Sequence, residues 1–451
     1  MARKTDINLR SLTFYQVFPR QHSIKQNFAG IQDDLDRIKG MGVDVLYLLP
    51  IHPIGKKARK GSQGSPYSIM DYYQIDPKYG TLDDFKRLVK SAHDRGIKVM
   101  MDIVFNHTSR DSVLVNTKPE WFYKNERNEF ANRVGDWSDI TDLDFKFREV
   151  WDYLIDVLKY WAQIVDGFRC DVAPLLPLDF WLEARAKVDQ VHPDMIWLTE
   201  SVHPGFIKYL RDLGYECSSD SEMYQAFDIC YDYDIFDYMN EYLANPIKLN
   251  HWLEAIIHQD VIYPKNYLKL RSFENHDQPR LRSKVRDRAH FIQMLALNFF
   301  IKGPAFIYAG QEHEIFVSPS LFENDLVPWN QKTSLESLIK RLASLKKQPI
   351  FVEGNFNYHA QEGVAMFSYT YQHQFLLGIF NLEQSISVKV PLIDGIYTNF
   401  YDESDIIVQD QTIQLSDKPI IIDTLKEHIR WKYLLMILLW FALKLRFKFS
   451  K

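Results

Sequence analysis

The chain has 451 residues, of which 46% are hydrophobic and 25% are charged, and its formal net charge is −5 at pH 7. This length supplies apolar side chains for more than one core, and the mild negative charge offers no basic surface for a nucleic-acid partner. The three cysteines, Cys170, Cys217 and Cys230, lack CxxC spacing, which argues against a disulfide framework or a zinc site. The polar start leads directly into an apolar segment at 12–18 without the apolar core of a signal peptide, so we expect a cytoplasmic location.

Short apolar segments alternate with segments of helical period along residues 1–347. The expected strands are 12–18, 43–50, 98–105, 167–172, 195–200, about 227–234, 269–275 and 304–309. The expected helices are 81–96, 148–165, 177–190, 286–301 and 333–347, and the first of them places Phe85, Leu88, Val89 and Ala92 on one face after a threonine cap. This alternation predicts an α/β fold, a (β/α)8 TIM barrel that forms the catalytic domain.

Three further parts of the chain depart from the barrel pattern. The segment 107–145 is too long for an ordinary turn after the third strand and is expected to form a short inserted subdomain. Alternating stretches such as VAMFSYTY and QFLLGIFNL predict an antiparallel β-domain, a β-sandwich, over 348–427. The tail, 428–451, holds an apolar run from Tyr433 to Leu443 between basic residues, which is too short for a bilayer span of about 20 residues. Packing against the rest of the chain is the favoured interpretation of this tail, and contact with a membrane surface is the alternative.

Four expected strands turn from apolar to polar at their C-terminal ends: MDIVFNH at His107, DGFRCD at Asp171, MIWLTE at Glu200 and LRSFENHD at Asp277. In a parallel barrel these ends face one side, where catalytic residues gather from several strands. Alternation along a strand points Arg169 and Asp171 to the same face, and a neighbouring guanidinium lowers the pKa of an acid by about 1–3 units. Each feature alone is more often a structural ion pair or a solvated acid. Their occurrence at four strand ends favours an active site with an ionised carboxylate as nucleophile.

In this order, DIVFNH, GFRCD, WLTE and ENHD resemble the four signature regions of the α-amylase family of glycoside hydrolases, family 13. YQVFPR at 15–20, GSPYSIMDYYQIDPKYGT at 64–81 and GPAFIYAGQE at 303–312 extend the resemblance over nearly the first 345 residues. The resemblance implies a TIM barrel with a small insertion after the third strand and a C-terminal β-sandwich. It also implies retaining cleavage of α-1,4 or α-1,6 glucosidic bonds in malto-oligosaccharide-like substrates.

The resemblance assigns the catalytic roles to three acids. By resemblance Asp171 is the nucleophile that forms a covalent glycosyl ester, and Glu200 is the general acid and later the base. Retaining glycosidases hold two such carboxyl groups about 5 Å apart. Asp277 is, by resemblance, the third acid, which holds sugar hydroxyls and stabilises the oxocarbenium-like transition state. Glu200 needs a raised pKa to hold its proton near neutral pH, and burial against Trp197 and the other carboxylates would raise it.

The resemblance also supplies substrate-binding residues. His107 and His276 match the histidines that hydrogen-bond the sugar at the cleavage position, and Tyr67 matches the tyrosine that stacks under the same sugar. Arg169, beside the nucleophile, completes this set. Each of the four alone is also compatible with a structural role. Asn106 belongs to the same motif as His107 and is expected to order the long loop, either as a calcium ligand or through hydrogen bonds alone.

The chain departs from the family pattern just after the nucleophile. Many endo-acting members have Lys-His three and four residues further on, where this chain has Pro174 and Leu175. The carbonyl of that histidine usually helps to bind calcium, so we expect no required cofactor, assign no metal ligand, and keep calcium as an alternative. Val172 follows the nucleophile directly, which in related oligosaccharide glucosidases goes with tolerance for α-1,6 bonds.

Three interpretations of function follow from these residues. The favoured one is a hydrolase of α-glucosidic bonds with an oligosaccharide as substrate. In the second, the same glycosyl-enzyme passes its sugar to another sugar or to phosphate, as in a transglycosylase, an isomerase or a phosphorylase. The third is a non-catalytic sugar-binding relative. Such relatives typically lose the acids, whereas this chain keeps all three.

Overall fold

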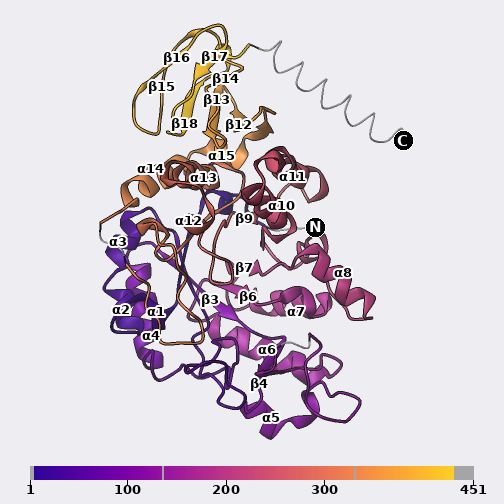
Figure 1. Cartoon of the computed structure of the whole chain (residues 1–451). Coiled ribbons are helices and arrows are strands. Elements are labelled where there is room, and N and C mark those ends of the chain that lie inside the picture. The colour runs from indigo at the N-terminus through magenta and orange to yellow at the C-terminus, as the bar shows by residue number, and fades with distance from the viewer. Residues whose placement is uncertain (1–4, 135–136, 330–331, 431–451) are drawn as a thin grey trace. The chain divides into compact units, whose positions relative to one another are not determined.

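The computed structural model describes residues 5–134, 137–329 and 332–430 (Figure 1). The chain divides into two compact units, one built from 1–236, 262–283 and 303–343 and the other from 237–261, 284–302 and 344–451. The apolar run from Tyr433 to Leu443 lies outside the described residues, so both interpretations of the tail stay predictions. Within the described residues, no helix combines the length and the apolar character that a membrane crossing requires.

A parallel sheet of eight strands forms the centre of the first unit. Its edge strands meet through one parallel bridge between Arg271 and Ala305, which closes the sheet into a barrel and confirms the predicted (β/α)8 fold. In spatial order the strands are β10 (Ala305–Tyr308), β1 (Thr13–Val17), β2 (Val45–Leu48), β3 (Lys98–Ile103), β6 (Gly167–Cys170), β7 (Ile196–Thr199), β8 (Ile229–Tyr231) and β9 (Lys269–Leu270).

The barrel strands are buried on both faces. All residues of β1, β2, β6 and β7 are buried, as expected for parallel strands between a filled interior and an outer layer of helices. Aromatic rings fill the space outside β7: the Trp181 ring lies 5.1 Å from Phe227 and 6.5 Å from Trp197. These contacts fix the strand that carries Glu200 at its end.

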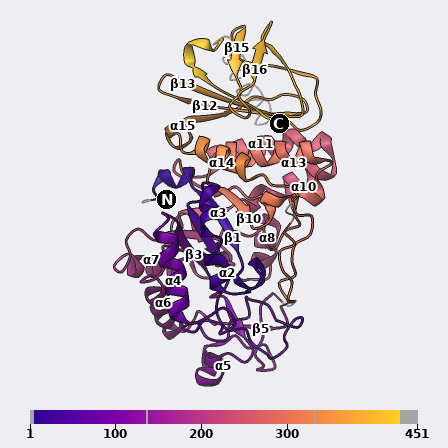
Figure 2. The same ribbon diagram turned by 90° about the vertical axis from the view of Figure 1, so that its left-hand side faces the viewer.

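Helices follow the strands along the chain. Helix α4 (Leu82–His93) begins with a capping box between Thr81 and Asp84 and buries the four residues that its periodicity predicts. It packs beside β3 and α2 (Figure 2). The other α-helices that begin in the first unit are α1 (Pro19–His22), α2 (Phe28–Gln32), α3 (Leu35–Gly40), α5 (Val113–Thr117), α6 (Arg148–Trp161), α7 (Leu178–Val188), α8 (Pro204–Asp212), α9 (Asp220–Met223), α10 (Tyr233–Ala244), α12 (Leu281–Lys284) and α14 (Glu336–Lys346).

The segment after β3 contains a short antiparallel pair. Strand β4 (His107–Ser109) pairs with β5 (Ile140–Asp142), and His107 is opposite Asp142. Trp121 and Phe122 are buried in this segment; the Trp121 ring lies 5.7 Å from Tyr153 of the following helix, and the Phe122 ring lies 5.8 Å from Phe130. The pairing brings the end of the insertion back to His107.

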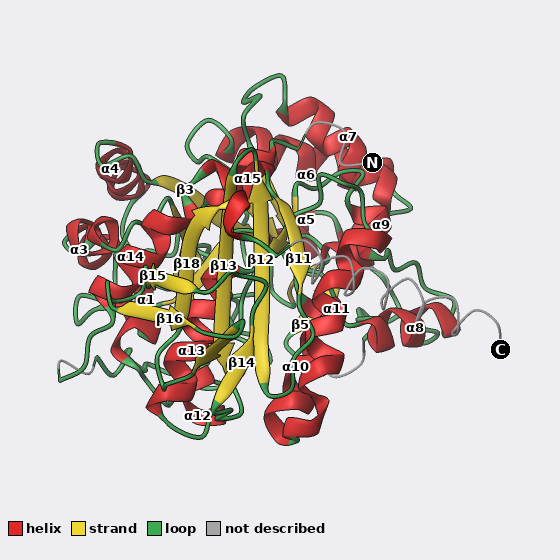
Figure 3. Ribbon diagram, turned by 90° about the horizontal axis from the view of Figure 1, so that it is seen from above, coloured by secondary structure: helices red, strands yellow, loops and turns green. Residues whose placement is uncertain are grey.

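The second unit contains the C-terminal antiparallel sheets, which confirms the predicted β-domain. Its main sheet has the order β11 (Asn355–Tyr358), β12 (Val364–Tyr371), β13 (Gln374–Asn381), β18 (Ile420–Leu425), and Figure 3 shows these four strands side by side. Two antiparallel pairs accompany it, β14 (Ser387–Lys389) with β17 (Thr412–Gln414) and β15 (Gly395–Thr398) with β16 (Asp405–Val408). Helices α11 (Leu249–Ile262), α13 (Arg288–Phe300) and α15 (Pro349–Glu353) complete the unit.

Helix α13 packs closely on β13 at Gly378. A Cβ atom at this position would lie 2.7 Å from the Phe300 ring, which is itself enclosed by Phe351, Tyr369 and Phe380. We expect Gly378→Ala to lower the free energy of unfolding by about 1–3 kcal/mol, because the ring has no space to retreat. Thermal unfolding measures this, with Gly205→Ala as the control because a Cβ atom there meets nothing within 4 Å. Equal unfolding temperatures for the two variants would contradict the prediction.

Candidate active site

A cavity of about 310 Å³ lies in the first unit at the C-terminal ends of the barrel strands. Five of the seven predicted site residues line it: Tyr67, His107, Asp171, Glu200 and Asp277. The barrel's own hydrogen bonds position two of the acids, since the Asp171 amide donates to the Ile103 carbonyl at 2.8 Å and the Glu200 amide donates to the Cys170 carbonyl at 3.0 Å. The two predicted acids on β6 and β7 therefore occupy adjacent, fixed positions.

Arg169 lies beneath the cavity and is 1% exposed. Its Nη1 donates to Asp171 Oδ1 at 2.9 Å, and its Nη2 lies 3.0 Å from Glu200 Oε2. Nη1 also donates to Asp102 Oδ1 at 2.8 Å. One guanidinium thus holds three carboxyl groups and keeps the two central acids side by side.

Burial controls the titration of these acids. It raises the pKa of Asp171 well above its usual range, the charge of Glu200 adds to this effect, and the Arg169 guanidinium opposes both. Burial likewise raises the pKa of Glu200 against the opposing charge of Arg169. Arg169 lowers the pKa of Asp171 as expected, but burial and the charge of Glu200 outweigh it, because this single positive charge is shared among three buried acids. The pair of acids titrates together and holds a proton to higher pH than isolated carboxyl groups do.

Asp277 has the opposite electrostatic setting. Burial disfavours its charged form, but the charges of His276, 3.0 Å away, and of Arg169 outweigh burial and hold the pKa of Asp277 below its usual range. His276 also contacts the hydroxyl of Tyr67 at 2.5 Å, and the two rings stack with centroids 5.6 Å apart. His276 thus joins the candidate stacking tyrosine to the third acid.

His107 lines the cavity next to the insertion. Burial lowers its pKa to about 4, so the ring is neutral near pH 7 and can donate or accept one hydrogen bond with a sugar hydroxyl. The Trp137 ring lies 5.6 Å from it. Its neighbour Asn106 donates to Asp142 Oδ1 at 3.4 Å, and its carbonyl accepts from the Leu143 amide at 3.0 Å, so Asn106 joins the strand end to the insertion.

The sequence predicts no residue as a metal ligand. Among residues 5–134, 137–329 and 332–430, the structure contains no group of three or more His, Cys, Asp or Glu side chains that could hold a metal ion.

Val172 has a left-handed backbone, with φ 36° and ψ 38°. A branched side chain rarely adopts this conformation. The turn directs the Val172 amide at the general-acid candidate, and the N–H donates to Glu200 Oε2 at 2.8 Å. This position therefore orients Glu200 through its backbone.

Sequence reasoning missed Asp102, the fourth acid of the cluster. It is fully buried and accepts hydrogen bonds from Tyr47 at 2.8 Å and Tyr67 at 3.0 Å, besides those from Arg169. A lone acid within the apolar run KVMMDIVF was the available signal, because a buried carboxylate needs charged or hydrogen-bonding partners.

Comparisons with known proteins agree with this geometry. The alpha amylase catalytic-domain family matches residues 16–118 and 112–350, and the bacterial alpha amylase C-terminal domain family matches residues 357–422. An alpha-amylase from Lactobacillus plantarum is 43% identical, with a TM-score of 0.90, over 93% of this chain and 100% of that chain. The noncanonic maltogenic alpha-amylase AmyB from Thermotoga neapolitana is 33% identical, with a TM-score of 0.82, over 93% of this chain and 99% of that one.

Two curated relatives match over a smaller share of both chains. The intracellular maltogenic amylase of Bacillus subtilis is 26% identical over 81% of this chain and 64% of its own length. An alpha-1,4-glucan:maltose-1-phosphate maltosyltransferase of Picrophilus torridus is 33% identical over 42% of this chain and 33% of its own length. The chain thus spans less than two thirds of these relatives. The catalytic-domain match covers most of the chain, and the structure brings the strand-end acids together in one cavity. The chain therefore belongs to the α-amylase family of glycoside hydrolases.

Proposed function

We propose that this protein is a retaining glycoside hydrolase that cleaves α-glucosidic bonds, α-1,4, α-1,6 or both, in malto-oligosaccharides. The observation that carries the proposal is the pairing of Asp171 and Glu200 on the two amino groups of Arg169. Retaining hydrolysis needs two carboxyl groups about 5 Å apart, one of which attacks while the other holds a proton. The two groups lie next to each other in a buried cavity that favours a retained proton.

The first step forms a glycosyl ester. The Asp171 carboxylate attacks the anomeric carbon, the glycosidic C–O bond breaks, and Glu200 gives its proton to the departing oxygen. In the second step Glu200 takes a proton from water, the water oxygen bonds to the anomeric carbon, and the ester bond to Asp171 breaks. The two inversions restore the α configuration of the released sugar.

The remaining site residues stabilise charge and orient the sugar. Asp277, whose pKa is lowered, is ionised over a wide pH range, and its negative charge stabilises the oxocarbenium-like transition state. Tyr67 offers a ring to the apolar face of the pyranose. His107 positions a hydroxyl group, and Arg169 and His276, which do not line the cavity, position the neighbouring acids.

Transfer to a second sugar or to phosphate is the alternative outcome for the glycosyl ester. The partial likeness to a maltosyltransferase favours keeping this alternative, whereas the likeness along nearly the whole chain to proteins named alpha-amylases supports hydrolysis.

Product analysis separates these outcomes. Purified protein is incubated with maltotriose, isomaltose, panose and starch, with and without phosphate, and the products are separated with detection of the anomer. Release of α-configured glucose or maltose without phosphate is expected. Larger oligosaccharides or a sugar phosphate would indicate transfer, and no product from any substrate would support a non-catalytic relative.

The coupled acids predict a bell-shaped pH dependence of kcat/KM. At low pH both Asp171 and Glu200 are protonated and no nucleophile is present; at high pH both are ionised and no acid remains. Because burial raises both pKa values, we expect the optimum to lie above that of exposed carboxyl pairs. Initial rates across a pH series test this. A rate that stays constant through the alkaline range would contradict the assignment of a protonated Glu200.

We propose that turnover requires no metal ion. Extensive dialysis against a chelator, followed by assay and thermal unfolding, is expected to leave both kcat and the unfolding temperature unchanged. Restoration by calcium of a lost activity would overturn this and support the calcium alternative.

We infer that the protein acts in the cytoplasm, in agreement with the name of its intracellular relative in Bacillus subtilis. An oligosaccharide is its proposed partner. Fractionation of cells that express residues 1–451 tests this inference and the alternative membrane contact of the tail.

A further inference from the structure

Three loops of the first unit contribute residues to the lining of the active-site cavity. Lys60 and Ser65 come from the segment after β2, Trp137 and Asp139 from the insertion, and Phe322 from the segment after β10. We call the residues 60–65, 137–140 and 321–323 the loop wall.

The first joint of the loop wall links the segment after β2 to the insertion. Lys60 Nζ lies 3.1 Å from Asp139 Oδ1, and the Asp139 side chain is 5% exposed. The Ser68 hydroxyl donates to the Asp139 carbonyl at 3.1 Å. The insertion is thus fixed against this segment by an ion pair and a hydrogen bond.

The second joint links the same segment to the residues after β10. The Gln63 amide donates to the Phe322 carbonyl at 2.9 Å, and the Ser62 hydroxyl donates to Glu323 Oε2 at 2.6 Å. A Cβ atom at Gly61 would lie 2.5 Å from the Phe322 carbonyl oxygen, so the two backbones are in direct contact. The loop wall is therefore continuous across three loops.

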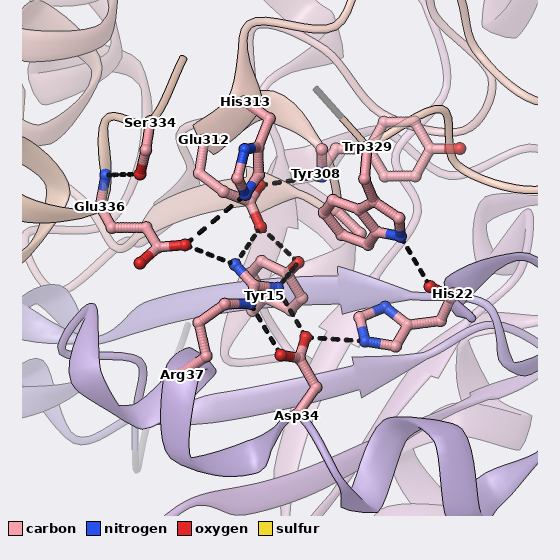
Figure 4. A network of polar contacts seen from close by, with 12 residues as sticks. Tyr15, His22, Asp34, Arg37, Tyr308, Glu312, His313, Trp329, Ser334 and Glu336 are labelled. Carbon is pink, nitrogen blue, oxygen red and sulfur yellow. Dashed lines mark hydrogen bonds and ion pairs between the residues drawn. The ribbon is translucent and has the colours of Figure 1, made fainter. Parts of the chain in front are cut away.

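A buried polar network holds the base of the segment after β10 (Figure 4). Glu312 accepts hydrogen bonds from Tyr15 at 2.7 Å and from Arg37 at 2.8 Å. Further along, the Trp329 indole donates to the His22 carbonyl at 2.9 Å, and the Arg37 guanidinium lies 5.2 Å from the Trp329 ring. Between these two ends the Arg20 guanidinium donates to the Leu321 carbonyl at 2.6 Å, which holds the backbone next to Phe322.

Barrel order places two of the three segments of the loop wall, 60–65 and 321–323, opposite the general-acid candidate. They follow β2 and β10, while Glu200 follows β7, which lies across the ring from β1, the strand between β10 and β2. Trp137 of the third segment packs instead against Val172 and Val202, beside Glu200. Glu200 protonates the departing oxygen, so the leaving part of the substrate extends on its side. The glycone, the part of the chain toward its non-reducing end, extends toward the segments 60–65 and 321–323.

We propose that the joined segments 60–65 and 321–323 of the loop wall close the glycone side of the site and make the enzyme exo-acting, so that it releases short products from non-reducing chain ends. A cavity of about 310 Å³ is at the small end of ligand sites, which are about 300–1,000 Å³. Lys60, which has three N–H donors and uses one on Asp139, binds hydroxyl groups of the terminal sugar. This inference rests on the proposed hydrolytic function and names the residues that limit product length.

The test compares maltoheptaose with the same oligosaccharide blocked at its non-reducing end by a 4,6-ethylidene group. A chain that must enter with its end against the wall cannot accommodate the block. We expect the native protein to consume the blocked substrate on the order of a hundredfold more slowly, the scale on which a pocket discriminates against an added group. Equal consumption of the two substrates would overturn the proposal, and consumption of neither would refute the hydrolytic function on which it rests.

Two variants test the joints of the loop wall. Lys60→Ala combined with Glu323→Ala removes both side-chain links, and we expect the ratio of blocked to free consumption to rise by about tenfold, with longer products from maltoheptaose. Lys57→Ala removes the same charge from an exposed position in the same segment and should leave the ratio unchanged. An unchanged ratio in a folded double variant would show that the joints do not limit entry. If the double variant fails to fold, the comparison of the two substrates with native protein still decides the proposal.

Discussion

Replacing Asp171 with Asn is expected to lower kcat by a factor on the order of 10⁵ while the fold is kept. The amide cannot form the glycosyl ester, yet it has nearly the same volume and its oxygen can still accept the hydrogen bond from Arg169. Initial rates on maltotriose measure the loss, and thermal unfolding reports whether the cluster keeps its stability.

The matched control is Asp94→Asn, which makes the same chemical change in a side chain that is 59% exposed at the end of α4. It should have normal activity. A second measurement adds azide to an Asp171→Gly variant with a glucosyl fluoride, because a small anion can attack the anomeric carbon from the vacated side. A β-glucosyl azide product would support the nucleophile assignment, and appreciable unaided turnover by Asp171→Asn would contradict it.

Replacing Glu200 with Gln is expected to reduce activity by about 10²–10⁴ on substrates whose leaving group needs a proton. Glucosyl fluoride and activated aryl glucosides should lose much less in the first step, because their leaving groups depart unprotonated. A neutral amide also changes the contact with Arg169 Nη2, so thermal unfolding accompanies the kinetics. The measurement is the ratio of the rate on maltose to the rate on an aryl glucoside, determined with one preparation of the variant and one of the native protein.

Glu216→Gln serves as the control because Glu216 is exposed and outside the cavity. The two kinds of substrate should respond to it equally. Equal losses for both kinds of substrate in Glu200→Gln would remove the general-acid role from this residue and leave it a structural ligand of Arg169.

Local patterns along the chain predicted the barrel and the place of its acids. Segments of four to eight apolar residues correspond to buried strands, and the change to a polar residue at the C-terminal end placed Asp171 and Glu200 correctly at the cavity. The sixth and seventh strands are shorter than predicted. For the predicted ranges of about 227–234 and 269–275, β8 covers Ile229–Tyr231 and β9 covers Lys269–Leu270. Beyond β9, Glu274 accepts hydrogen bonds from Arg280 and the Leu281 amide.

Contacts between distant segments could not be predicted from those patterns. The ion pair of Lys60 with Asp139 and the bond of Ser62 to Glu323 join residues 79 and 261 positions apart, and no periodicity connects such residues. The sharing of Arg169 among three acids also depends on the register of β3, β6 and β7, which the sequence of one strand does not contain. The division into two compact units, which assigns 237–261 and 284–302 to the second, also arises from contacts between distant segments.

The left-handed turn at Val172 lowers the stability of the fold and supports the activity of the site. Holding a branched residue in this conformation costs about 1–3 kcal/mol, which a glycine would largely recover. The same freedom would let the peptide rotate and withdraw its N–H from Glu200. Selection of heat-resistant variants would therefore favour a change at this position, and selection for turnover would oppose it.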